Sequence, residues 1–145
     1  VLDQQGKSSV LEMGCYGIGL GRCMAAIAQE YHDDKGLIWP LEVAPFKVII
    51  VCLSGKDDAV VEAAETVYHQ LKESLGDDVL LDDRKESPGR KFADADLLGI
   101  PIQILVGKSF IKSEQFECRL RGKESQLFSF EELQGFVDKA LESVL

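Results

Sequence analysis

The segment from Phe46 to Leu53 is apolar or β-branched at nearly every position, which is typical of a strand buried on both faces of a sheet. After a turn at residues 54–57, the chain continues into a long stretch with helical spacing that Gly76 closes. A strand that is covered on both faces and followed by an amphipathic helix predicts a layered α/β domain. The stripe of that helix consists of Val60, Ala64, Val67, Leu71 and Leu75.

The same alternation continues through the middle of the chain. Residues 79–81 predict a short strand, and the polar loop at residues 82–91 contains a Pro-Gly turn signal. Residues 92–98 predict a short helix ended by Gly99, and residues 102–106 predict another buried strand after Pro101. Because strands and helices alternate, we expect helices on both faces of the sheet.

The last third predicts one more strand and a closing helix. Residues 115–120 alternate apolar and polar side chains, so this strand exposes one face, which carries Arg119 and Arg121. Ser129 and Glu132 form a capping-box pattern before a helical stripe that reaches Val144. The fold class is therefore α/β, with three layers and a mixed, mainly parallel central sheet.

The first third has a different organisation. Residues 11–16 predict a short strand that enters a glycine-rich turn, and the apolar spacing from Cys23 to Tyr31 predicts a helix closed by Gly36. Two prolines then fall between residues 37 and 45, where no periodicity remains. We expect a first unit at residues 1–36, a linker at 37–45 and the α/β domain at 46–145.

Charge is distributed unevenly along the chain. The net charge of −9 argues against nucleic acid, because affinity for phosphates comes from clustered cations. The segment from Arg84 to Lys123, however, contains nine basic residues and only five acidic ones. A local patch that binds RNA is thus compatible with an acidic chain.

Other classes of protein are disfavoured. The four cysteines form no CxxC pair and the two histidines lie far apart, so we expect no metal site. No apolar run approaches the roughly 20 residues that span a bilayer, and the first residues do not resemble a secretory signal. We therefore expect a cytoplasmic location and no membrane partner.

The pattern Gly17-x-Gly19-x-x-Arg22 is a candidate nucleotide site. Glycines let a planar ligand approach the backbone, and an arginine at a helix start can bind phosphate oxygens. A tight strand-to-helix turn with a solvated arginine explains the same residues. The dinucleotide-binding fingerprint is excluded, because Arg22 stands where that motif needs a small residue.

The string from Met13 to Gly19, followed by Arg22, resembles the third signature motif of bacterial prolyl-tRNA synthetases, which are class II enzymes. Further fragments follow in the family's order and spacing and extend the resemblance over nearly the whole chain. They are Ile38-Trp39-Pro40, Ala44-Pro45-Phe46, Asp82-Asp83-Arg84, Pro88-Gly89, Lys91-Phe92-Ala93-Asp94 and Leu98-Gly99-Ile100-Pro101.

This resemblance implies an anticodon-binding domain preceded by a strand-turn-helix remnant of the catalytic domain. It implies a parent enzyme, expected to be a homodimer, that joins proline to tRNA with ATP and Mg²⁺ through prolyl-adenylate. Gly17, Gly19 and Arg22 then match the ATP-binding residues of the family. This piece alone is expected to be inactive and to hold no cofactor, because the other two class motifs are missing.

The resemblance also places tRNA contacts in the charged loop and the exposed strand, with no role for DNA. Arginine, lysine and glutamate together can donate to and accept from the bases of single-stranded RNA. The expected anticodon-binding residues are Arg84, Lys85, Glu86, Arg90, Lys91, Arg119 and Arg121.

Alternative explanations stay open at this point. The charged residues could instead form a structural ion-pair cluster of Asp82, Asp83 and Arg84 beside a solvated face. The domain could belong to a threonyl or histidyl relative, or be a non-catalytic protein-interaction module of the same fold. A flavodoxin-like nucleotide binder is the least favoured, since residues 54–57 are too short for a phosphate loop.

Overall fold

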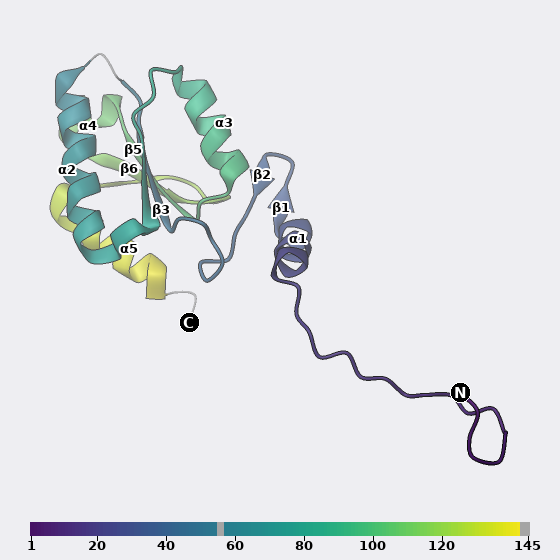
Figure 1. The fold of residues 1–145 in the computed structure, drawn as a ribbon. Coiled ribbons are helices and arrows are strands. Elements are labelled where there is room, and N and C mark those ends of the chain that lie inside the picture. The colour runs from purple at the N-terminus through teal and green to yellow at the C-terminus, as the bar shows by residue number, and fades with distance from the viewer. Residues whose placement is uncertain (55–56, 143–145) are drawn as a thin grey trace.

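The computed structural model describes residues 1–54 and 57–142, and five strands form its main sheet in the order β4-β3-β5-β6-β7 (Figure 1). β4 and β5 flank β3 in parallel, and β6 and β7 continue the sheet in antiparallel pairing. The expected mixed sheet is thus confirmed, and β7 is a strand that the sequence did not predict. The bounds are β3 Val48–Cys52, β4 Val79–Asp82, β5 Ile102–Val106, β6 Phe116–Leu120 and β7 Gln126–Phe128.

Helices cover both faces of this sheet, as expected. α2 (Asp58–Leu75), α4 (Lys108–Ser113) and α5 (Phe130–Glu142) lie on one face, and α3 (Pro88–Leu98) lies on the other (Figure 1). β3 alternates its side chains between the two resulting cores, which is why all its residues are buried. The sheet thereby separates a large core under α2 and α5 from a small core under α3.

α2 follows the predicted stripe. Its N-cap Asp57 accepts a hydrogen bond from the Ala59 amide at 3.2 Å, and Gly76 ends it with φ 62°. Val60, Val67 and the other stripe residues up to Leu71 are buried. Residues 55 and 56 of the predicted turn lie outside the described residues.

α3 begins earlier than predicted. Ser87 caps the helix by accepting a bond from the Arg90 amide, and Pro88 occupies the first turn. Proline is favoured there because its missing N–H has no partner in a first turn, so this Pro-Gly pair starts a helix rather than a turn. Gly99 ends the helix in the left-handed region with φ 71°, as predicted.

The C-terminal elements match their patterns. Phe116 and Cys118 of β6 are buried, and Glu132 accepts bonds from the amide and hydroxyl of Ser129 at 3.0 Å each, which confirms the capping box. Leu133 and Val137 of α5 lie in the core, while Val144 lies outside the described residues.

The N-terminal third differs from its prediction. Residues 10–18 form no strand and extend away from the sheet (Figure 1), because no other described segment pairs its backbone with them. α1 (Leu20–Glu30) is present, but it ends before Gly36. Gly36 lies instead in a small hairpin of β1 (His32–Asp33) and β2 (Gly36–Leu37).

This hairpin packs against the C-terminal end of α3. The Trp39 amide donates to the Gly99 carbonyl at 3.3 Å, and Trp39 is 8% exposed. Gly36 meets the backbone of Leu97 so closely that a Cβ would overlap it. In the part of the chain that the structure describes, no helix is long and apolar enough to cross a membrane.

Candidate nucleic-acid interface

Four of the side chains predicted to bind RNA lie exposed between the end of β4 and the first turn of α3. The side chains of Arg84 and Arg90 are 51% and 66% exposed, and Glu86 lies 3.8 Å from Arg90. The group stands at the carboxyl ends of parallel strands, the edge where open α/β sheets bind ligands. We call this group, Arg84, Lys85, Glu86 and Arg90, the charged loop.

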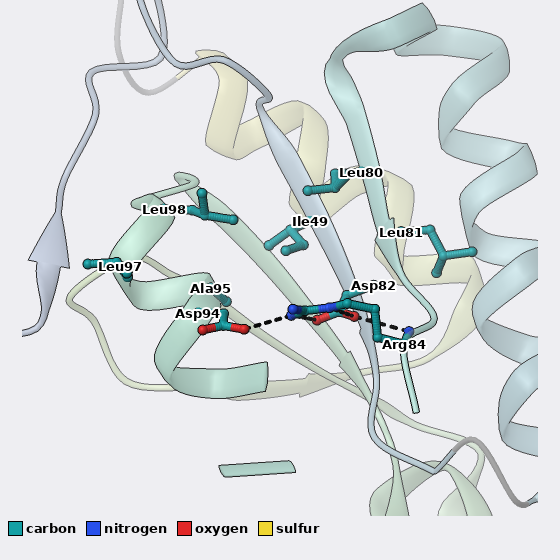
Figure 2. Close-up of a pocket in the computed structure, with 9 residues that line it drawn as sticks. All are labelled: Ile49, Leu80, Leu81, Asp82, Arg84, Asp94, Ala95, Leu97 and Leu98. Carbon is teal, nitrogen blue, oxygen red and sulfur yellow. Dashed lines mark hydrogen bonds and ion pairs between the residues drawn. The ribbon is translucent and has the colours of Figure 1, made fainter. Parts of the chain in front are cut away.

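Arg84 is held in a fixed orientation. Its Nε and Nη2 donate to the two carboxylate oxygens of Asp82 at 2.9 and 2.8 Å, and Nη2 also donates to Asp94 of α3 at 2.9 Å (Figure 2). This fork matches part of the structural ion-pair alternative, although Arg84 keeps half of its side chain in solvent. The arginine therefore joins the strand end to the helix and still exposes half of its side chain.

Protonation should loosen this ion pair. The hydrogen bonds from Arg84 lower the pKa of Asp82 below its ordinary value despite partial burial. A lowered folded-state pKa gives stability that is present above the unfolded pKa of about 3.9 and lost as pH falls through the folded value. We expect Arg84→Met to reduce the acid dependence of the unfolding free energy, measured by urea denaturation at neutral and acid pH. Equal pH dependence in Arg84→Met and wild type would contradict this.

Lys91 is buried rather than exposed. Its side chain is 1% exposed, and its ammonium donates to the carbonyls of Cys52 at 2.6 Å and Asp82 at 3.1 Å. The side chain lies beneath the charged loop and is not part of the surface.

Arg119 forms a second polar group on the same face of the sheet. It donates from Nε to Gln103 and from Nη2 to Asp96, each at 2.8 Å, and it lies 5.8 Å from the centre of the Phe92 ring. The side chains of Arg119 and Asp96 are 22% and 13% exposed. We call Phe92, Asp96, Gln103 and Arg119 the strand cluster; it combines a donor, an acceptor, an amide and an aromatic face.

The prediction that Arg121 lies on an exposed face is wrong. Its side chain is 3% exposed and binds both oxygens of Asp33 at 2.7 and 3.0 Å, while Nε donates to the Asp96 carbonyl at 3.1 Å. These bonds lower the pKa of Asp33 far below its ordinary range, with the Arg121 bond as the largest cause. Arg121 therefore holds the hairpin against the α/β domain.

The two surface groups flank α3. Arg84 reaches Asp94 from the β4 side, and Arg119 reaches Asp96 from the β6 side. Arg121 lies at the end of the sheet away from the charged loop, next to the residue that precedes β5, and it contacts Asp96 beside Arg119. The structure thus brings together five of the seven predicted anticodon residues around one helix and buries Lys91 and Arg121.

A cavity of about 380 Å³ opens between β4 and α3 (Figure 2). Asp82, Arg84 and Asp94 form its polar rim, and the rest of its lining is apolar. An apolar pocket beside an arginine suits a planar aromatic group. The apolar lining consists of Ile49, Leu80, Leu81, Ala95, Leu97 and Leu98.

The predicted nucleotide-binding residues Gly17, Gly19 and Arg22 are all exposed. A Cβ at Gly17 would meet no described atom within 4 Å, and one at Gly19 would meet only Arg22. These residues therefore do not enclose a ligand by themselves. In residues 1–54 and 57–142, no group of three histidine, cysteine or acidic side chains lies close enough to hold a metal ion.

Gln103, Asp96 and Asp33 are among the residues of these sites that were missed at the level of sequence. Gln103 is a polar residue inside a buried apolar run, which is itself a signal for a side-chain partner. Asp96 and Asp33 carry no such signal, because their partners are 23 and 88 residues away.

Known proteins resemble this chain over most of its length. Proline-tRNA ligase of Bacillus licheniformis is 45% identical over 144 residues, 99% of this chain and 25% of the relative. Its counterpart in Geotalea daltonii is 47% identical over 146 residues, with the same two shares. That of Aquifex aeolicus is 50% identical over 119 residues, 82% of this chain and 20% of the relative. The chain thus spans about a quarter or less of the curated relatives it matches.

A family profile matches the α/β domain itself. The profile described as "Anticodon binding domain" covers residues 47–140. That range contains the complete five-stranded sheet and reaches into α5. The chain therefore belongs to the anticodon binding domain family.

Proposed function

We propose that residues 46–145 bind the anticodon loop of a prolyl tRNA, within an enzyme that joins proline to tRNA. The relatives named above are proline-tRNA ligases, and this chain corresponds to about a quarter of their length. The observation that carries the proposal is the strand cluster, because its partly exposed side chains, Arg119, Asp96 and Phe92, complement a guanine base. A prolyl anticodon carries two adjacent guanines.

The strand cluster has free positions for such a base. The bonds within it use Nε and Nη2 of Arg119 and Oδ1 of Asp96, so among the described residues Nη1 and Oδ2 are left for a ligand. An arginine can donate to O6 and N7 of guanine, and a carboxylate can accept from its N–H groups. Phe92 adds an aromatic face on which an unpaired base can stack.

The charged loop would hold the RNA backbone beside this cluster. Lys85 and Arg90 are exposed cations next to the N-terminus of α3, whose unpaired amides and dipole also favour phosphate. Glu86 adds an acceptor for a base, and the cavity beside Arg84 can receive an unstacked ring. Lys91 and Arg121 support these groups from below.

Arg119→Ala is expected to weaken binding of a prolyl anticodon stem-loop by about 1–3 kcal/mol, because it removes one base-reading contact. The measurement is titration of the RNA at fixed salt with prolyl, threonyl and histidyl stem-loops. Only the prolyl RNA should bind tightly, and its advantage should shrink in Arg119→Ala.

Lys139→Ala is the matched control, since Lys139 is exposed on α5 at the other face of the sheet. Its affinity should equal that of wild type. Equal affinity of wild type and Arg119→Ala for the prolyl stem-loop would overturn the base-reading assignment.

We also propose that residues 1–36 belong to the catalytic part of the enzyme and residues 37–45 to a linker. Gly17, Gly19 and Arg22 would then contribute to a site for ATP, which with Mg²⁺ supplies the energy of proline activation. Since these residues enclose nothing on their own, other surfaces of the enzyme would complete that site. A homodimeric parent enzyme acting in the cytoplasm fits the same proposal.

A further inference from the structure

Lys91 is a buried cation near the N-terminus of α3, where charged side chains are more often exposed to solvent. Its ammonium lies 2.6 Å from the carbonyl of Cys52 and 3.1 Å from that of Asp82. Cys52 is the last residue of β3 and Asp82 the last residue of β4. One side chain therefore joins the ends of two neighbouring parallel strands to the helix that covers them.

These contacts lie at both ends of the charged loop. Asp82 precedes the loop and Lys91 follows it, so their 3.1 Å hydrogen bond closes the segment at its base. The Asp82 carboxylate lies 3.7 Å from the same ammonium and receives the Arg84 fork on its outer side. Arg84 is thereby linked to Lys91 through Asp82.

We propose that Lys91 is a positioning residue, which fixes the charged loop for RNA without touching RNA itself. The inference rests on the proposed function, because it assumes that this loop contacts tRNA. A loop that is ordered before binding loses less conformational entropy when it binds, so the benefit of Lys91 appears as affinity. A residue that contacts phosphate acts differently, because it also releases counterions.

Lys91→Met keeps an unbranched side chain that is only one atom shorter and removes its three donors. We expect prolyl stem-loop binding to weaken about tenfold at constant salt, with the preference for prolyl over other stem-loops unchanged. The slope of log K against log salt should stay at the wild-type value. Arg90→Ala, a change at an exposed cation of the same helix, should instead reduce that slope by about 0.7.

Amide hydrogen exchange in the free protein gives a second measurement that needs no RNA. The amide of Arg84 donates to the Asp82 carboxylate, and the amide of Glu86 donates to the Arg84 carbonyl. Hydrogen exchange at both amides should become faster in Lys91→Met. Lys139→Met is the matched control and should leave exchange in this loop and RNA affinity unchanged.

The outcomes separate the two proposals. A reduced salt slope or an unchanged affinity in Lys91→Met would overturn the positioning role. If wild type binds no prolyl stem-loop, the proposed function fails, and the exchange rates alone decide whether Lys91 orders the loop. If Lys91→Met does not fold, Lys91→Arg, which keeps a cation at this position, is tested by the same RNA titration and hydrogen exchange. A salt slope near the wild-type value, together with slower amide exchange in the charged loop than in Arg84→Met, supports the positioning role. Equal amide exchange in Lys91→Arg and Arg84→Met overturns it.

Discussion

Replacing Arg121 by alanine should lower the free energy of unfolding by about 3 kcal/mol. The substitution removes a nearly fully buried guanidinium that forks onto Asp33 and donates to the Asp96 carbonyl. The carbonyl loses its donor, and the space left between hairpin and helix is not filled by alanine. Urea denaturation at neutral pH measures the loss.

The same variant should release the hairpin from α3. Trp39 is the single tryptophan of the chain and lies next to Gly99, two residues after the docked hairpin. Its emission should therefore shift to the red in Arg121→Ala, because the indole gains contact with water. Arg119→Ala, on the same strand but with a more exposed side chain, is the control and should leave the emission unchanged. An unfolding free energy within 1 kcal/mol of wild type would contradict the inference that Arg121 holds the hairpin against the α/β domain.

The sheet and its covering helices could be predicted because their signals are local. A buried parallel strand such as β3 needs apolar side chains on both faces, and α2 needs one apolar stripe with a cap at each end. Each condition can be recognised within a short stretch of the sequence. The order of the strands, β4-β3-β5-β6-β7, was not predicted, because the alternation of strand and helix determines the layers and not the order within the sheet.

Single-residue environments could not be predicted in the same way. Arg121 continues the alternation of β6, which indicates solvent, yet Asp33 reaches it from 88 residues away. Lys91 follows a polar loop, yet a Pro88 helix start rotates it under that loop. Burial of a charge depends on partners that only the folded chain supplies.

The prediction of an N-terminal strand was wrong for a related reason. The apolar character of residues 11–16 indicates burial, but Leu11 and Met13 are 69% and 84% exposed. A strand is a property of at least two backbones, and no described segment pairs with this one. A short apolar run therefore predicts a strand only where another segment is available to pair with it.

Gly99→Ala should destabilise the protein by about 3 kcal/mol or more. Gly99 has φ 71°, a left-handed conformation that costs other residues roughly 1–2 kcal/mol. A Cβ at this position would also overlap the carbonyl of Leu37 in the hairpin, and backbone cannot move aside as a flexible side chain would. The two costs act together, so the hairpin must leave α3 or the helix end must distort.

Gly122→Ala separates these two costs. Gly122 follows β6 with φ 80°, and a Cβ there would meet no described atom within 4 Å. This variant carries the conformational cost alone, so its loss should be only about 1 kcal/mol. Urea denaturation of both variants gives the difference, which measures how firmly the hairpin is packed. Equal losses of unfolding free energy at the two glycines would mean that displacing the hairpin costs no free energy. The ion pair of Arg121 with Asp33 would then contribute nothing to holding the hairpin against α3.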